Sequence, residues 1–115
     1  MRLSEVTRKL EAEEIVAPKA DVEIKNVCAS DLLSDILATD QYEFLILTGL
    51  TTPQVIRTAE IVGALGVVIV RGKYPGQGLI GLAKAHQMPL YVTKMPMFDA
   101  CVKLSKIIEY KGLNG

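Results

Sequence analysis

The sequence is poor in the residues that usually mark a catalytic or metal-binding protein. It contains no tryptophan, one histidine and two cysteines, so zinc-ligand patterns and a Cys–His nucleophile have few candidate residues. His86 is expected near the end of a helix, where a cation stabilises the helix C-terminus. Cys28 and Cys101 each lie in an apolar pattern, which favours buried, free thiols in a reducing compartment. We predict no catalytic residue, no metal site and no cofactor.

The chain also lacks an excess of charge and a long apolar run. Thirteen basic and thirteen acidic residues cancel, so no overall field attracts nucleic acid or an anionic membrane. The acidic run Glu11, Glu13 and Glu14 is interpreted as a solvated face. The longest apolar stretch, 61–70, is shorter than the roughly 20 residues that cross a bilayer, and residues 1–10 lack the apolar core of a signal peptide. We therefore expect a cytoplasmic protein without nucleic-acid or membrane partners.

A strong alternation of strand and helix signals is present instead. The chain has 115 residues, half of them apolar, which is enough for one domain with one core. Three solid apolar runs, 44–47, 67–70 and 90–92, each precede an amphipathic helical pattern. Such strands are typical of a parallel sheet that helices cover on both faces. We predict a single three-layer α/β/α domain over residues 1–115, with a mostly parallel sheet of about five strands.

The first third of the chain carries weaker signals. Ser4 is predicted to cap a short helix, which a strand over 14–17 follows. Residues 22–27 alternate apolar and polar side chains, so we predict a half-buried strand that lies at an edge or pairs antiparallel. Ser30 is predicted to cap the next helix. That helix is expected to bury one face made of Leu32, Leu33, Ile36 and Leu37.

Two glycine motifs resemble nucleotide-binding loops but have the wrong spacing. Residues 76–81 read G-x-G-x-x-G before a helix, as in dinucleotide-binding proteins. Residues 71–75 separate this motif from the preceding strand, and no acidic residue ends the next strand, so we interpret it as a loop that enters a helix. Residues 66–73 have five residues between their glycines, where a phosphate loop needs four. A small nucleotide-dependent enzyme that uses Gly76–Gly81 stays open as an alternative.

Polar residues follow each of the three buried strands. In a parallel sheet these loops meet at one edge, where α/β proteins bind ligands. Hydroxyl groups, backbone N–H groups, a helix N-terminus and cations together suit an anion, although Thr52 followed by Pro53 also fits an ordinary helix start. The candidate ligand-binding residues are Thr48, Gly49, Thr51, Thr52, Arg71, Gly72, Lys73, Thr93 and Lys94.

Several short segments together resemble a known family. They are 29–35 (ASDLLSD), 47–50 (LTGL) leading to 54–60 (QVIRTAE), 70–73 (VRGK) and 89–93 (PLYVT). In order and spacing they are similar to a stand-alone DRTGG domain, related to the N-terminal domain of HPr kinase/phosphorylase. The string DRTGG itself is absent, and residues 48–50 and 71–73 stand at its loop positions.

The resemblance implies a regulatory role rather than catalysis. Domains of this family accompany CBS domains, phosphotransacetylase or a kinase domain, form dimers, and as single domains are encoded beside iron hydrogenase and serine-kinase-like genes. The leading hypothesis is a non-enzymatic, homodimeric regulatory module that senses a small anionic ligand, either a nucleotide or a phosphorylated metabolite. The alternative is a pure interaction subunit whose partner enzyme is a hydrogenase or a serine-kinase-like protein.

Overall fold

The chain folds around one mixed β-sheet. The computed structural model describes residues 1–108; residues 109–115, the end of the predicted domain, lie outside the described part. The five strands stand in the order β1-β5-β4-β3-β2, all parallel except β1, which runs antiparallel to β5. The strands are β1 (Glu13–Val16), β2 (Asn26–Ala29), β3 (Phe44–Thr48), β4 (Gly66–Ile69) and β5 (Leu90–Val92), and the helices are α1 (Leu3–Lys9), α2 (Leu33–Leu37), α3 (Gln54–Val62), α4 (Gln77–His86) and α5 (Met97–Ile107).

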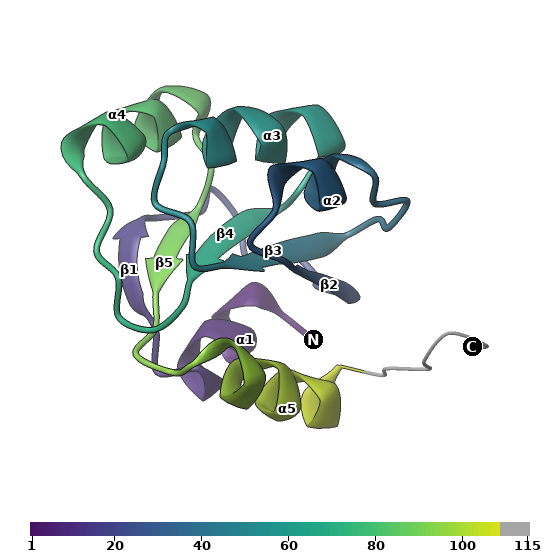
Figure 1. Ribbon diagram of the computed structural model, residues 1–115. Helices are drawn as coiled ribbons and strands as arrows, with labels where there is room; N and C mark the ends of the chain where they lie inside the picture. Colours follow the sequence, from purple (N-terminus) through teal and green to yellow (C-terminus); the bar gives the residue numbers. More distant parts are fainter. Residues whose placement is uncertain (109–115) are drawn as a thin grey trace.

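Helices cover both faces of this sheet, which confirms the predicted three-layer α/β fold. Figure 1 shows α2, α3 and α4 above the sheet and α1 and α5 below it. The interior strand β3 is buried along its whole length. Phe44 and Ile46 pack toward the first group of helices, while Leu45 and Leu47 pack toward the second. Because successive side chains of a strand point to opposite faces, a solid apolar run supplies both cores.

The crossover helices explain why one face carries three helices. The parallel strands β2, β3, β4 and β5 are neighbours in the sheet in the same order as in the sequence. Each connection therefore crosses to the next strand in the same direction across the sheet. Right-handed crossovers in one direction place their helices on the same face. After β5 the chain passes to α5 on the opposite face (Figure 1). The loops that leave the neighbouring strands β4 and β5 therefore diverge.

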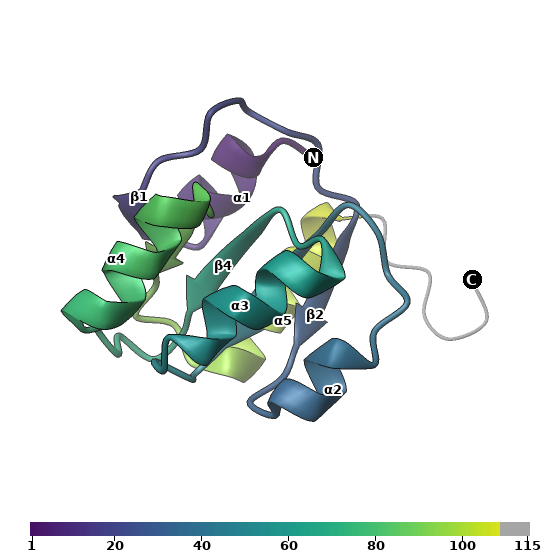
Figure 2. The same cartoon turned by 90° about the horizontal axis from the view of Figure 1, so that it is seen from above.

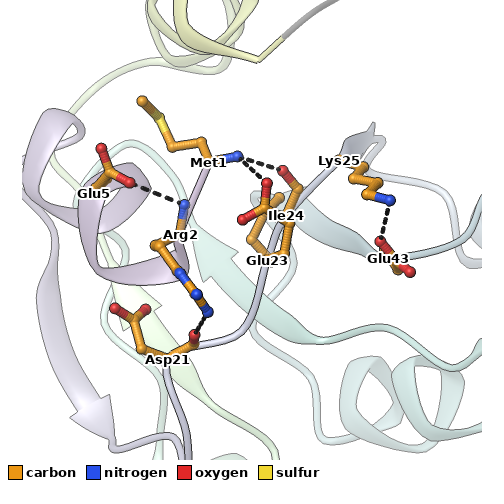
Figure 3. Close-up of polar contacts among 8 residues, drawn as sticks. All are labelled: Met1, Arg2, Glu5, Asp21, Glu23, Ile24, Lys25 and Glu43. Carbon is orange, nitrogen blue, oxygen red and sulfur yellow. Dashed lines mark hydrogen bonds and ion pairs between the residues drawn. The ribbon is translucent and has the colours of Figure 1, made fainter.

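The helix α1 is capped by a distant residue rather than by Ser4. The N-cap residue is Arg2, and Ser4 lies inside the helix. Asp21 accepts hydrogen bonds from the Ser4 backbone N–H at 2.9 Å and from its hydroxyl at 2.6 Å. Arg2 donates to the Asp21 carbonyl at 2.7 Å, and the Met1 ammonium contacts Glu23 at 2.8 Å (Figure 3). The carboxylate of Asp21 thus satisfies the N–H group that a local cap would have satisfied.

The predicted strand over 22–27 is shifted in the structure. The strand β2 begins at Asn26 and lies at the sheet edge, where it pairs parallel with β3. The residues before it pair with the N-terminal segment instead. Leu3 N–H donates to the Val22 carbonyl at 2.9 Å, and Ile24 N–H donates to the Met1 carbonyl at 2.7 Å. The alternating pattern did indicate extended backbone, but only its last residues enter the sheet.

Two predicted helix caps are also wrong. Ser30 accepts the Leu32 N–H at 3.0 Å, which closes a turn before α2, and the N-cap residue is Leu32. The N-cap residue of α3 is Pro53, one residue after the predicted Thr52. Because α2 has only five residues, it buries Ile36 but leaves Leu32 and Leu37 exposed.

The cysteines and the histidine differ in how well they match expectation. Cys28 and Cys101 are free but half-buried, rather than fully buried as predicted. Burial raises the pKa of both thiols, which keeps them protonated at neutral pH. His86 is the last residue of α4, as expected, and its Nδ1 lies 3.8 Å from a Glu60 carboxylate oxygen.

Tyr91 gives the fold a pH dependence in the alkaline range. Burial, with smaller contributions from the charges of Glu14 and Asp21, raises the pKa of Tyr91 to about 12. An unfolded tyrosine has a pKa of about 10. The folded state therefore holds this proton more tightly, so the stabilisation is complete below about pH 10 and is lost as the pH rises toward 12. We expect the melting temperature to fall across this interval.

Comparison of thermal melts between the two pH values tests this expectation. Tyr91→Phe removes the titrating hydroxyl and should flatten the alkaline decline. Tyr42→Phe is the matched control, because Tyr42 is exposed, and it should leave the decline unchanged. An equally steep decline in Tyr91→Phe would contradict the assignment.

Candidate functional site

The predicted ligand-binding residues all lie at one edge of the sheet. Thr48 ends β3 and the others occupy the loops that follow β3, β4 and β5, whose carboxyl ends share this edge because the strands are parallel. The antiparallel strand β1 begins at the same edge, since Glu13 lies opposite Val92. In Figure 2, seen from above, the segments that enter α2, α3 and α4 gather along this side of the molecule. Thr51 is half-buried and Thr52 exposed in the segment that enters α3.

An aspartate that was not among the candidates connects two of these loops. Asp31 follows β2, and its Oδ1 accepts the Gly49 N–H at 2.6 Å. Its Oδ2 lies 3.5 Å from the guanidinium Nη2 of Arg71. A methyl group at Gly49 would collide with that guanidinium, so the ion pair needs a glycine at this position. The signal in the sequence was an acidic residue in a loop at the same edge as the basic ones.

The turn at 70–73 holds Arg71 in a fixed place. Arg71 and Gly72 both adopt left-handed backbone, with φ of 63° and 65°. Their N–H groups donate to the Met95 and Thr93 carbonyls, each at 2.8 Å. A non-glycine residue in this region costs about 1 kcal/mol or more, and these bonds to the loop after β5 offset that cost. The turn therefore directs the Arg71 side chain toward Gly49 and presents Gly72 toward β5.

Two candidate threonines have a structural role. Thr48 is buried, and its hydroxyl accepts the Leu50 N–H at 3.1 Å. Thr93 is also buried; its hydroxyl accepts the Met95 N–H at 3.2 Å and donates to the Leu10 carbonyl at 2.6 Å. Each hydroxyl closes the first turn of its loop.

Three backbone N–H groups at this edge are not available to a ligand, because those of Gly49, Arg71 and Gly72 are bonded within the protein. Lys73 and Lys94 are exposed, and neither forms an ion pair within the described residues. A methyl group on Gly72 would lie 3.8 Å from Cγ of Lys94, so the loops after β4 and β5 are in close proximity. This edge therefore presents a small cation cluster, Lys73 and Lys94, beside the ion pair of Asp31 and Arg71.

A cavity of about 370 Å³ opens beside this cluster, between the loops after β4 and β5. We call it the β4–β5 cavity. Tyr74 lies on its wall and donates its hydroxyl to Glu13 at 2.9 Å. Of the predicted site residues, three line the cavity, and several lining residues were not predicted. The lining residues are Leu10, Glu11, Glu13, Gly72, Tyr74, Val92, Thr93, Lys94 and Met95.

The glycine motif at 76–81 has ordinary helix-entry geometry. Gly76 is the N-cap of α4, with φ of −81°, and Gly78 and Gly81 are exposed on the helix. A methyl group at Gly76 or Gly81 would meet nothing within 4 Å, and at Gly78 only Pro53 at 3.5 Å. Within the protein, none of the three glycines is required by a positive φ or by a close backbone contact.

Residues 1–108 offer neither a metal site nor a membrane-spanning helix. Among these residues no group of three or more histidine, cysteine, aspartate or glutamate side chains is placed to hold a metal ion. None of the helices in the described chain has the length and apolar character to cross a membrane.

The fold of this chain is similar to that of a solved regulatory region. No protein-family model and no curated protein matches the chain. Among solved structures, the chain is similar to the CBS and DRTGG domains of the regulatory region of Clostridium perfringens pyrophosphatase, crystallised with the activator diadenosine tetraphosphate. The TM-score is 0.72 at 14% sequence identity, over 92% of this chain and 46% of that one. The chain thus spans less than half the length of this neighbour, and it has a DRTGG-like α/β fold.

Proposed function

We propose that this protein is a non-enzymatic regulatory module that binds a small anionic ligand, a nucleotide or a phosphorylated metabolite, at the carboxyl edge of its sheet. The observation that carries the proposal is the turn at 70–73, which carries Arg71 and Lys73 and whose Gly72 lies beside Lys94 of the next loop. A guanidinium binds phosphate through two parallel hydrogen bonds, and lysines add charge. The solved neighbour belongs to a regulatory region crystallised with a nucleotide activator, which supports a ligand of this class.

A regulatory role fits the chemistry of the edge better than catalysis does. Arg71 and the lysines bind anions but do not supply a nucleophile with an adjacent base. The one histidine of the sequence, His86, ends α4 and so lies away from the strand ends that carry the cations. Phosphate recognition without a reacting group is what a ligand sensor needs.

We further propose that the module forms a homodimer. Leu32 and Leu37 on α2 and Ile61 on α3 are exposed at 60%, 48% and 72%, and α2 and α3 pack against each other. Exposed apolar side chains gathered on neighbouring helices favour association. Light scattering at micromolar concentration should give the mass of two chains. A monomer would contradict the dimer and leave the ligand proposal untouched.

The first test is thermal stabilisation by anions. We expect AMP, ATP, diadenosine tetraphosphate or inorganic phosphate to raise the melting temperature, because a ligand at about 100 times its Kd adds about 2.7 kcal/mol of stability. The double variant Arg71→Ala/Lys73→Ala should lose this shift. Lys84→Ala is the matched control, since Lys84 is exposed in the last turn of α4.

Two outcomes contradict the ligand proposal. One is the absence of a shift with every anion, and the other is an unchanged shift in the double variant. The absence of any shift would favour the alternative of a pure interaction subunit that docks through its exposed apolar side chains onto a hydrogenase or a serine-kinase-like enzyme, whereas an unchanged shift in the double variant would mean that the anion binds elsewhere on the chain.

A second test uses the ion pair itself. Asp31 occupies Arg71 in the free protein, and both side chains are about half exposed, at 47% and 45%. Such a pair is worth at most about 1 kcal/mol, so a phosphate group competes for Arg71 against a weak partner. Asp31→Asn keeps an oxygen that accepts the Gly49 N–H but removes the charge. We expect phosphate to bind about fivefold more tightly, measured by calorimetric titration.

The control for this substitution is Asp35→Asn. Asp35 lies exposed on α2 and forms no ion pair within residues 1–108, so its loss alters the net charge of the chain equally without freeing Arg71. Equal gains in both variants would mean that only overall charge matters. Weaker binding in Asp31→Asn would mean that Asp31 holds Arg71 in its binding position.

A further inference from the structure

The β4–β5 cavity lies between two neighbouring loops that lead to opposite faces of the sheet. The loop after β4 leads to α4 on one face of the sheet, and the loop after β5 leads to α5 on the other (Figure 1). In open α/β sheets, neighbouring loops that diverge in this way leave a crevice outside the carboxyl ends of the strands, where ligands bind. The cavity is lined by both of these loops and by the segment that enters β1. Its position follows from the topology.

The volume and the lining residues of the cavity suit a ligand that contains one ring system. Its volume of about 370 Å³ lies at the lower end of the roughly 300–1,000 Å³ typical of small-molecule sites. Leu10, Tyr74 and Met95 give it an apolar lining. The Tyr74 side chain is 59% exposed, so protein atoms leave much of its ring uncovered. An exposed aromatic ring beside a thioether suits a flat aromatic ligand such as a nucleobase.

The charges around the cavity are of both signs. Glu11 and Glu13 lie on the β1 side, and Lys94 lies in the loop after β5. A bare anion would be repelled by the two carboxylates, whereas hydroxyl and amino groups donate hydrogen bonds to them. Carboxylates at the carboxyl edge of α/β sheets bind ribose hydroxyl groups in this way. Lys94 lies beside Gly72, so a ligand that fits the cavity carries its anionic group on the Lys94 side.

Tyr74 is held in place by one of these carboxylates. Its hydroxyl donates to Glu13 Oε2 at 2.9 Å, a contact that joins the loop after β4 to the first strand. This contact leaves the second oxygen of Glu13 and both oxygens of Glu11 as acceptors, because no hydrogen bond or ion pair occupies them within the described residues. The aromatic wall is thus fixed before a ligand arrives.

We propose that the β4–β5 cavity binds the nucleoside part of a mononucleotide, with the base on Tyr74, the ribose hydroxyl groups on Glu11 and Glu13, and the phosphate toward Lys94 and Arg71. This inference rests on the proposed function, because the phosphate uses the cations assigned there. It adds that the ligand is a nucleoside phosphate and that the selectivity lies in residues that carry no positive charge.

The experiment is a calorimetric titration of the full chain with the four ribonucleoside monophosphates, ribose 5-phosphate and inorganic phosphate. At least one nucleotide should bind about tenfold more tightly than ribose 5-phosphate, and ribose 5-phosphate more tightly than phosphate. Tyr74→Ala should reduce nucleotide affinity to that of ribose 5-phosphate. Tyr74→Phe keeps the ring and should stay within about threefold of the wild type. Tyr42→Ala, which removes another exposed tyrosine, is the control.

The outcomes separate this inference from the function on which it rests. If every nucleotide binds no better than phosphate, or if Tyr74→Ala binds nucleotides like the wild type, the cavity assignment is overturned. Phosphate binding that is lost in Arg71→Ala/Lys73→Ala would then still support an anion sensor. If phosphate and all nucleotides fail to bind, the proposed function falls together with the inference.

Discussion

Phe44→Ala is expected to lower the free energy of unfolding by about 4 kcal/mol, because truncation of a buried phenylalanine combines lost burial with a cavity. Phe44 begins the interior strand β3 and is fully buried. It belongs to the core under α2, α3 and α4, beside residues such as Ile36 and Ile56. The backbone around it is fixed as well, since the Phe44 carbonyl accepts the Leu65 N–H at 2.9 Å, so the space left by the ring closes poorly.

Urea unfolding measures this loss, and Tyr42→Ala provides the control. Tyr42 lies just before β3 but is 67% exposed, so the same kind of truncation should cost less than about 0.5 kcal/mol. A typical domain of this size has only about 5–15 kcal/mol of stability, which makes the expected loss a large fraction of the total. A difference below about 1.5 kcal/mol between the two variants would show that the β3 core is loosely packed.

Thr93→Val is expected to cost about 3 kcal/mol, although the two side chains have nearly the same shape. The Thr93 hydroxyl donates to the Leu10 carbonyl at 2.6 Å and accepts the Met95 N–H at 3.2 Å. Valine leaves both backbone groups without this partner in a buried place, at about 1–3 kcal/mol for each group. The loss should appear in the absence of any ligand, since it concerns the join between the end of α1 and the loop after β5.

Thr93→Ser separates this structural role from direct ligand contact. Serine keeps the hydroxyl, so it should lose only the burial of one methyl group, about 1 kcal/mol. Chemical unfolding of the three proteins without ligand gives the comparison. If Thr93→Val were as stable as the wild type and only bound anions less well, Thr93 would be a ligand contact and its hydrogen bonds would contribute little to the fold.

The strands that were predicted well are those whose signal is local and is present on both faces of the strand. The runs at 44–47, 67–70 and 90–92 are apolar at every position, so either register buries them. The structure places strands at Phe44–Thr48, Gly66–Ile69 and Leu90–Val92. The alternating segment at 22–27 is apolar on one face only, so its strand signal is weaker. Its first residues pair with residues 1–3 and do not enter the sheet.

The candidate site was predicted by position but not by contacts. Parallel topology alone brings the loops after β3, β4 and β5 to one edge, so the sequence indicated the right loops. It did not indicate that Asp31 holds Arg71, because that ion pair depends on the neighbouring position of β2 and on a left-handed turn at Arg71. Asp31 was absent from the predicted site, and Glu11 and Glu13 were assigned to a solvated face.

The α/β layers and the edge where the loops meet therefore follow from local sequence patterns, because hydrophobic periodicity and chain direction are properties of neighbouring residues. Which polar groups are free at that edge depends instead on contacts between distant residues. The bonds that settle this question join distant residues, such as Tyr74 with Glu13, 61 positions apart, and Thr93 with Leu10, 83 positions apart. They form because the antiparallel strand β1 packs beside β5, which brings the end of α1 and the side chains of Glu11 and Glu13 to the same edge as the cations.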